Sequence, residues 1–92
     1  MEFEWDPGKR AANILKHGLD FEDACEIFEN RHAVKIDKRR NYGEVRYQCI
    51  GVLNNRIVVL VYTIRGNVCR IISLRKANEK EQSKFYNRLG SC

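Results

Sequence analysis

Apolar and polar residues follow strand spacing in some parts of the chain and helical spacing in others, and the changes predict eight elements. Near the start, Phe3 and Trp5 alternate with Glu2 and Glu4, which is the pattern of a half-exposed strand. The chain is thereby predicted to be a small α+β protein of order β-α-α-β-β-β-β-α with a mainly antiparallel sheet packed by helices. We expect helices over residues 7–17, 21–28 and 79–89 and strands over residues 2–5, 34–36, 45–53, 56–64 and 68–75.

Capping residues mark the ends of the first and third predicted helices. Asp6 offers an N-cap, and Pro7 follows at the first helical position, where a missing N–H loses no hydrogen bond. Gly18 ends this helix. Asn78 and Glu81 have the spacing of a capping box for the third helix.

The second predicted helix is amphipathic. Asp20 can cap it, with Asp23 three residues later. Its apolar residues recur at helical spacing, so we expect them to form its buried face: Phe21, Ala24, Cys25 and Phe28.

Two turns, at residues 54–55 and 65–67, join three strands into an antiparallel meander. The strand over residues 56–64 is apolar on both faces, so we expect it to be central and covered on both sides. Symmetric pairing places residues 47, 62 and 70 in one row across the strands, and residues 52, 57 and 75 in another. One face then carries Val45, Cys49, Val58, Leu60, Ile72 and Leu74 as a floor for two helices, and the other carries Arg46, Gln48, Thr63, Ser73 and Arg75 beside Val59 and Val61. The second, mixed face is the expected place for a polar site.

Composition and charge narrow the possible functions. Ninety-two residues with 43% hydrophobic content predict one domain over residues 1–92, and we expect disorder at residues 90–92. The net charge of +5 divides into −5 over residues 1–30 and +10 over residues 31–92. A basic chain favours a polyanionic partner. The acidic start does not resemble a secretory signal, and no long apolar run is present, so we expect a cytoplasmic protein without membrane contact.

The cysteines and histidines do not predict a metal site. The four cysteines are too far apart for a C-x-x-C pair, and those within apolar stretches (Cys25, Cys49 and Cys69) are expected to be core residues. His17 and His32 add little, because zinc ligands come in closely spaced groups. We therefore expect neither metal nor cofactor.

The first helix carries a group of cations. Lys9, Arg10, Lys16 and His17 all lie three or four positions from Asn13 and are expected to surround it on one face, with Ala11, Ala12, Ile14 and Leu15 on the buried face. An ordinary solvated helix face and a cationic binding patch both fit this pattern. Of the two histidines, His17 is the better candidate for proton transfer, since an imidazole with a pKa near 6.5 suits that role and His32 has no evident partners.

The segment from Arg70 to Tyr86 brings further cations to a junction between a strand and a helix. Strand parity puts Arg70 and Arg75 on opposite faces unless a bulge intervenes. Arg70 would share a row with two tyrosines and could stack on a ring, whereas Arg75 opens toward the mixed face and is the preferred phosphate ligand. Tyr86 has two interpretations, as a packing residue or as a catalytic or base-stacking group.

The sequence limits the chemistry open to such a site. No nucleotide-binding glycine loop, no G-x-S-x-G motif and no pair of strand carboxylates for two-metal cleavage is present. A phosphodiesterase of this kind would act on RNA, whose 2′-hydroxyl is an internal nucleophile. It would need a base near that hydroxyl, cations for the developing charge and an acid for the 5′ oxygen.

Three segments, in order, resemble the BrnT family of toxins: FEWDPGKRAANILKHGLDFEDACEIF, YGEVRYQCIG and RIISLRKANEKEQSKFY. The resemblance runs from Phe3 to Tyr86, and its most specific pieces are WDP, KHG and the RIISLRKA-x-x-x-E block. It implies a BrnT-like toxin domain with a RelE-like fold and a metal-independent endoribonuclease activity that arrests growth. It also implies a BrnA-like ribbon-helix-helix antitoxin in a hetero-oligomer that neutralises the toxin, contacts operator DNA through the antitoxin and represses its own operon.

Matching positions and residue chemistry together give the candidate site. The expected catalytic residues are His17, Arg46, Arg75 and Tyr86, and the expected RNA-binding residues are Lys9, Lys16, Arg70, Lys76 and Glu81. If the first helix covers the apolar face of the sheet, His17 reaches the mixed face only around a sheet edge. Trp5 and Asp6 are interpreted as a packing anchor and a helix cap. The alternatives are a noncatalytic nucleic-acid-binding or corepressor module and a pure interaction subunit.

Overall fold

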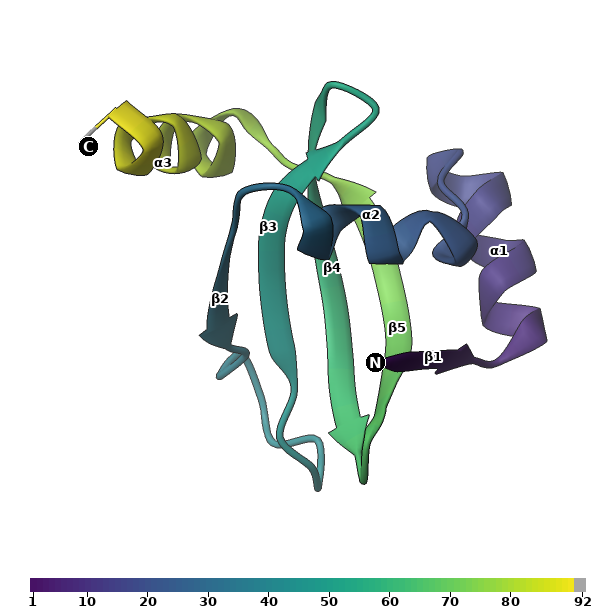
Figure 1. The fold of residues 1–92 in the computed structure, drawn as a ribbon. Helices are drawn as coiled ribbons and strands as arrows, with labels where there is room; N and C mark the ends of the chain where they lie inside the picture. Colours follow the sequence, from purple (N-terminus) through teal and green to yellow (C-terminus); the bar gives the residue numbers. More distant parts are fainter. Residues whose placement is uncertain (91–92) are drawn as a thin grey trace.

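The computed structural model describes the backbone of residues 1–90 and side chains as far as Arg88. Five strands form one sheet of order β1-β5-β4-β3-β2 (Figure 1). The elements are β1 (Glu2–Trp5), α1 (Pro7–His17), the 3-10 helix η1 (Phe21–Asp23), α2 (Ala24–Glu29), β2 (His32–Ile36), β3 (Tyr47–Leu53), β4 (Arg56–Arg65), β5 (Val68–Lys76) and α3 (Glu79–Gly90). β1 is parallel to β5, and the other pairs are antiparallel. The α+β class and the predicted order of elements are confirmed.

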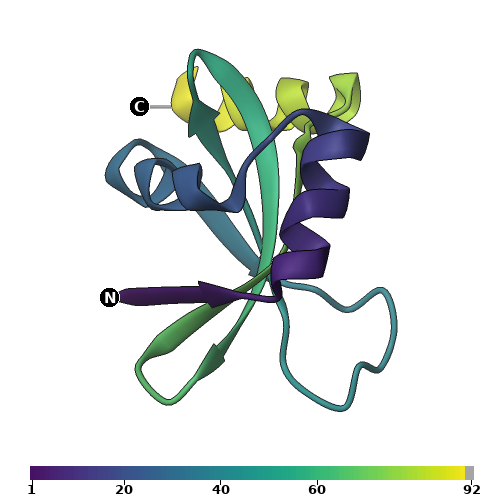
Figure 2. The same cartoon turned by 90° about the vertical axis from the view of Figure 1, so that its right-hand side faces the viewer.

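Strand β4 lies in the middle of the sheet and is buried on both faces, as its apolar sequence predicts. Val58 and Leu60 belong to a large core under α2 and η1, which also contains Phe21, Ala24, Ile27, Cys49, Leu53, Tyr62, Cys69, Ile71 and Leu74. Val59 belongs to a smaller cluster on the opposite face, with Ile57, Ala77 and Phe85. Figure 2 shows α2 on one side of the sheet and the loop of residues 37–46 on the other.

Helix α1 lies along the edge of the sheet beside β5 (Figure 1), attached through Asn13. The Asn13 amide donates to the Leu74 carbonyl at 2.9 Å and accepts from the Leu74 N–H at 3.2 Å. It also donates to the Leu19 carbonyl at 2.9 Å. Because β1 pairs with β5 only at residues 68–71, the edge at Leu74 lacks a strand partner, and the amide takes that place.

The predicted faces of α1 are therefore wrong. Asn13 is 7% exposed, whereas Leu15 is 90% and Ile14 39% exposed. Arg10, expected in a cationic group around Asn13, instead forms a two-point ion pair with Asp20, both contacts at 2.8 Å. This pair lowers the pKa of Asp20 to about 2.

A β-bulge changes the predicted register of β5. Tyr47 pairs with Tyr62 and Val52 with Ile57 as expected, but the β4–β5 pairing shifts between residues 61 and 62. The turn at residues 66–67 pairs Arg65 with Val68, so Thr63 faces Arg70. Beyond the bulge, Val59 faces Arg75. The extra residue in β5 is Ile72, so the core takes Ile71 and Leu74 instead of Ile72.

The bulge also decides where the two arginines of β5 lie. Arg70 alternates with the buried Cys69 and Ile71, and Arg75 follows the buried Leu74. Both arginines are consequently on the mixed face, so the predicted separation onto opposite faces is wrong. Val45, predicted in the floor, lies outside β3 and is 55% exposed.

Smaller local predictions have mixed outcomes. Asp6 caps α1 by accepting from the Lys9 N–H at 2.9 Å, and Gly18 ends it at φ 69°. Asp20 caps η1 rather than an α-helix. Trp5 packs against the large core, as an anchor should.

Of the three cysteines expected in the core, Cys49 and Cys69 are buried, with pKa values raised by burial to about 12 and about 11. Cys25 is exposed, because Ile27 takes the buried position of α2. Gly90 is the last residue of α3, and residues 91–92 lie outside the described part of the chain. No helix in the described part is long and apolar enough to cross a membrane.

The Asn13 contact predicts a large loss of stability on substitution. Asn13→Ala leaves two backbone groups of the buried sheet edge without partners, which reduces the free energy of unfolding by about 2–4 kcal/mol. Urea denaturation measures this loss. Asn41→Ala, which removes an exposed loop hydrogen bond, is the matched control and should change stability by less than about 1 kcal/mol. Equal losses in the two variants would show that Asn13 does not hold the edge.

Candidate functional site

A groove of about 540 Å³ opens on the mixed face, where β2 and the loop after it approach the junction of β5 and α3. Its lining contains four cations and two carboxylates, and we call it the cationic groove: Lys35, Lys38, Arg39, Arg75, Asp37 and Glu81, with Ile36 and Gln48. The predicted mixed face is thus the location of a charged cleft.

Arg75 is fixed in this groove by Glu81. Its Nη1 and Nη2 donate to the two carboxylate oxygens at 2.8 and 2.9 Å. The Asn78 N–H also donates to Glu81, and Asn78 Oδ1 accepts from the Glu81 N–H, which confirms the predicted capping box. These contacts, led by the Arg75 hydrogen bonds, lower the pKa of Glu81 to about 2.

The pairing leaves part of the guanidinium available. Glu81 accepts one hydrogen from each of the two Nη atoms of Arg75. The second Nη1 hydrogen is directed to the Lys76 carbonyl, with 3.3 Å between Nη1 and the oxygen. Guanidinium has five N–H donors, so Nε–H and one Nη2–H remain, and neither meets an acceptor within the described residues. Arg75 is therefore a positioned cation with an open two-donor edge.

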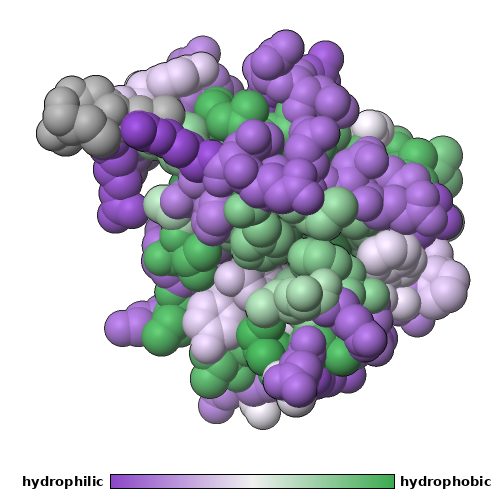
Figure 3. Space-filling model, viewed as in Figure 1, coloured by the Kyte–Doolittle hydropathy of each residue, from purple (hydrophilic) through white to green (hydrophobic). Residues whose placement is uncertain are grey.

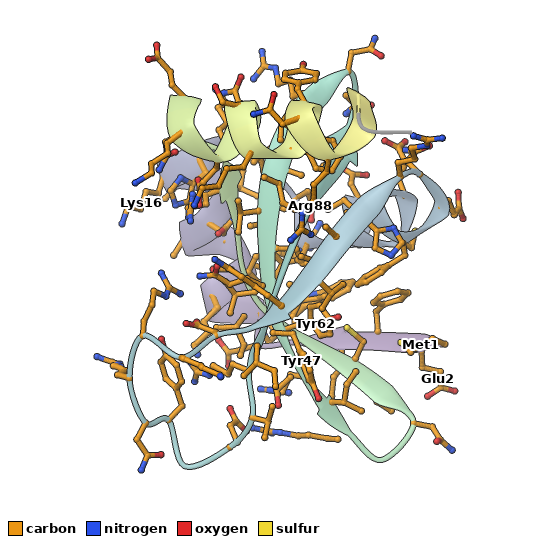
Figure 4. All side chains as sticks on the ribbon, turned by 90° about the vertical axis from the view of Figure 1, so that its left-hand side faces the viewer. Met1, Glu2, Lys16, Tyr47, Tyr62 and Arg88 are labelled. Carbon is orange, nitrogen blue, oxygen red and sulfur yellow. The ribbon has the colours of Figure 1, made fainter. Side chains whose placement is uncertain are left out.

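His17 is the last residue of α1 and is close enough to Arg75 and Lys76 for their charges to act on its imidazole. It is four residues after Asn13, on the same side of the helix, and therefore turns toward the same sheet edge. Partial desolvation, followed by the charges of Lys16, Arg75 and Lys76, lowers the pKa of His17 below its ordinary value of 6.5. Because α1 lies on the edge and not over the apolar face, its C-terminal end has access to the mixed face around that edge, but His17 is not part of the lining of the cationic groove. Lys16 is exposed next to it (Figure 4).

Lys76 is not part of the lining of the cationic groove. It lines a second pocket of about 300 Å³, together with Asn55, Arg56, Ile57, Gln82 and Tyr86. Tyr86 is 58% exposed, so its interpretation as a core residue is wrong. The centroids of the Tyr86 ring and the buried Phe85 ring are 6.4 Å apart, in an edge-on arrangement. Tyr86 is not part of the lining of the cationic groove but lies on the other side of Lys76.

Three other candidates lie apart from this group. The guanidinium carbon of Arg46 lies over the Tyr42 ring, 4.1 Å from its centroid, and Arg46 Nε is 3.4 Å from Glu44 Oε2. Arg70 is 3.5 Å from Glu4, in the neighbouring strand. Lys9 is about 10 Å along the α1 axis from Lys16, at 1.5 Å per residue.

The predicted stacking of Arg70 on a tyrosine is wrong. Tyr47 and Tyr62 stack on each other at 5.4 Å, and Arg70 faces Thr63. The turn is the reason: Arg65 pairs with Val68 across residues 66–67, so the turn is one residue shorter than predicted, and this shift moves Arg70 out of the tyrosine row.

Several groove residues were missed at the sequence level. Lys35 alternates with Val34 and Ile36 in β2, and this pattern could have identified it as a residue of the opposite face. The pair of Asp37 with Arg39 had no such signal, although its two contacts of 2.9 and 2.8 Å lower the pKa of the buried Asp37 carboxyl. Within residues 1–90, no group of three His, Cys, Asp or Glu side chains is placed to hold a metal ion.

Comparison with known proteins agrees with the motifs. A family of proteins described as the ribonuclease toxin BrnT of type II toxin-antitoxin systems matches residues 5–81. This range contains His17, Arg75, Lys76 and Glu81 and ends before Tyr86. A comparison with curated proteins gives no match. The match covers most of the chain, which therefore belongs to the BrnT family of type II toxin-antitoxin ribonuclease toxins, with a cognate antitoxin as partner.

Proposed function

We propose that this chain is a metal-independent endoribonuclease that cleaves RNA by attack of the 2′-hydroxyl on the adjacent phosphate. The observation that carries the proposal is the cationic groove in which Glu81 fixes Arg75, with His17 close enough for the charges of Arg75 and Lys76 to lower the pKa of its imidazole. A base and positioned cations are the two elements that such a reaction requires.

Arg75 is the phosphate ligand in this proposal. Its free Nε–H and Nη2–H can bind two oxygens of one phosphate, the geometry in which a guanidinium is most effective. Glu81 does not contact substrate in this proposal. It acts as a positioning residue, because it binds Nη1 and Nη2 of the Arg75 guanidinium. Lys76 and Lys16 add positive charge for the dianionic phosphorane.

His17 is the proposed base. With its pKa below 6.5, the ring is mainly neutral at pH 7 and can accept the 2′-hydroxyl proton. The O2′–P bond then forms, the P–O5′ bond breaks, and the products are a 2′,3′-cyclic phosphate and a 5′-hydroxyl. Tyr86, across Lys76, is the proposed donor of the proton to O5′.

The remaining cations have a supporting role. Arg46 and Arg70 are on the mixed face but held by carboxylates outside the groove, so they are suited to flanking phosphates rather than to the reacting one. Lys9, exposed at the start of α1, adds to the same long-range attraction.

A noncatalytic nucleic-acid-binding or corepressor module is the alternative. The same cations would bind RNA or DNA with a strong salt dependence and no strand cleavage. The lowered pKa of His17 next to a half-occupied guanidinium favours the catalytic proposal, since simple phosphate binding needs no neutral imidazole.

We further propose that the antitoxin is a BrnA-like ribbon-helix-helix protein that neutralises the toxin in a hetero-oligomer and contacts operator DNA in the autorepressing complex. An apolar groove of about 380 Å³ on the α2 side of the sheet offers a docking surface, lined by Met1, Phe3, Phe28, Val34, Tyr47, Tyr62 and Ile64. Figure 3 shows apolar residues gathered on this face, and Figure 4 shows Glu2 next to Met1. With Glu29 following Phe28 in α2, the surroundings are acidic and fit an amphipathic, basic antitoxin segment.

Removal of the Arg75 guanidinium tests the catalytic proposal. Arg75→Ala should lower kcat/KM for RNA cleavage by about 100-fold or more, the effect of losing a positioned charge in the transition state. Wild-type cleavage should continue in EDTA. Arg65→Ala, at the exposed end of β4, is the matched control and should cleave as the wild type does. Loss of wild-type activity in EDTA, or full activity of Arg75→Ala, contradicts the proposal.

The role of His17 predicts a specific pH dependence. A base works in its neutral form, so a lowered pKa places the acidic limb of log kcat/KM below pH 6.5. Lys16→Gln removes a charge that lowers this pKa, and the limb should therefore move to higher pH. Lys80→Gln, on the exposed side of α3, should leave it in place. A limb that is identical in wild type and Lys16→Gln would exclude His17 as the base.

Substitution in the apolar groove tests the antitoxin surface. Ile64→Lys introduces a charge into a groove that is otherwise apolar, so affinity for the co-expressed antitoxin should fall at least about tenfold by calorimetry. Ribonuclease activity of the free toxin should be unchanged. The control is Leu15→Lys, an equally apolar position on α1 outside the groove. Wild-type antitoxin affinity of Ile64→Lys would place the interface elsewhere.

A further inference from the structure

A small pocket adjoins the cationic groove, beneath α3 and against β2 and β3. Its volume is about 120 Å³, and its lining consists of Ala33, Val34, Lys35, Gln48, Ile50, Val59, Glu81, Lys84, Phe85 and Arg88. Lys35, Gln48 and Glu81 also line the cationic groove, so the two cavities are direct neighbours. Figure 4 shows Arg88 extending from α3 toward β2.

The apolar part of the pocket fits a flat ring. Ile50, Val59 and Phe85 form its inner wall and belong to the smaller core cluster or pack on it. A volume of this size is far below the several hundred Å³ of a pocket for a drug-sized ligand, and it suits one planar ring.

Gln48 stands at the boundary of the two cavities and is 8% exposed. With its amide oxygen turned to Arg39, that oxygen accepts from Arg39 Nε at 3.1 Å and from Nη2 at 3.3 Å. No buried side-chain nitrogen or oxygen of the described residues lacks a hydrogen-bond partner, so the Gln48 amino group is not an orphaned donor. An amide nitrogen carries two hydrogens, however, and because Gln48 lines the small pocket, its amino group can offer a hydrogen to a ligand there.

The charged residues of the pocket are also mostly donors. Lys35, Lys84 and Arg88 are cations, whereas both oxygens of Glu81 are already bonded to Arg75. The pocket therefore favours a ring that presents acceptor oxygens toward Lys35 and Gln48. A pyrimidine base has a carbonyl oxygen in this position, and adenine has none.

We propose that the small pocket binds the nucleobase of the nucleotide whose 2′-hydroxyl attacks, and that it selects a pyrimidine through a carbonyl oxygen bound by Gln48 Nε2 and Lys35 Nζ. The inference rests on the proposed ribonuclease function and adds its substrate preference. Arg75 in β5 and Gln48 in β3 lie on the same face on either side of β4, where they pair with Val59 and Val61, and both line the cationic groove. In the proposal, a phosphate on Arg75 and a base in the pocket belong to one nucleotide.

The test uses four oligodeoxynucleotides, each with a single ribonucleotide, so that a 2′-hydroxyl is available at one position only. The ribonucleotide carries uracil, cytosine, guanine or adenine, and single-turnover cleavage is measured for each. The wild type should cleave after uracil or cytosine at least about tenfold faster than after adenine, the discrimination expected from one or two hydrogen bonds to a base edge.

Variants connect this preference to the pocket. Gln48→Glu replaces the amino donor by an acceptor, and the pyrimidine-to-adenine ratio should fall toward one. Gln82→Glu makes the same change at the other glutamine of the chain, on the side of α3 that lines the Tyr86 pocket, and should keep the wild-type ratio. Lys35→Gln, at an exposed position, should also lower the ratio, and it provides the test if Gln48→Glu does not fold.

The outcomes separate the inference from the function on which it rests. Equal wild-type rates on all four substrates, or an unchanged ratio in both Gln48→Glu and Lys35→Gln, would overturn the base pocket and leave the ribonuclease proposal intact. If the wild type cleaves neither these substrates nor a full-length RNA, the ribonuclease proposal itself fails, and the base pocket fails with it.

Discussion

The side-chain amide of Asn13, bonded to both backbone groups of Leu74, is the contact on which the candidate site depends. β1 is too short to cover all of β5, and Asn13 completes the uncovered edge. This attaches α1 beside the sheet instead of across its face. His17, one helical turn after Asn13, thereby lies where the charges of Arg75 and Lys76 act on it. A contact that stabilises the fold therefore also assembles the candidate site.

The bulge in β5 is the second constraint. Without its extra residue, Ile72, the parity of β5 would place Arg70 and Arg75 on opposite faces. With it, Leu74 and Ile71 both point into the large core, and both arginines lie on the mixed face. The capping box of α3 then uses Glu81 to fix Arg75. The strand end, the helix start and the ion pair act together as one support for the guanidinium.

Local signals in the sequence were sufficient for much of the fold. Asp6 and Asn78 cap helices, and Gly18 ends α1 with a positive φ, as their residue types predict. The sequence of β4, apolar on both faces, predicted its central position in the sheet. The faces of α1 could not be predicted, because this helix is held by a buried asparagine while Leu15 stays in solvent. The bulge depends on packing between distant segments and has no local signature.

The residues of the candidate site likewise include some that the sequence predicted and some that it did not. His17, Arg75, Lys76 and Glu81 were singled out from the sequence. The structure pairs Arg75 with Glu81 and places His17 where the charges of Arg75 and Lys76 act on it. Gln48 was placed on the correct face, but the orientation of its amide depends on Arg39, which the chain supplies from a loop.

The most direct measurement is a crystal structure of the protein bound to an oligoribonucleotide whose 2′-hydroxyls are methylated to prevent cleavage. The account predicts one phosphate on the Nε and Nη2 edge of Arg75, with the His17 ring facing the adjacent O2′ and Lys76 within reach of the same phosphate. An oligonucleotide bound elsewhere, with the open edge of Arg75 in solvent and His17 away from any ribose, would contradict the account.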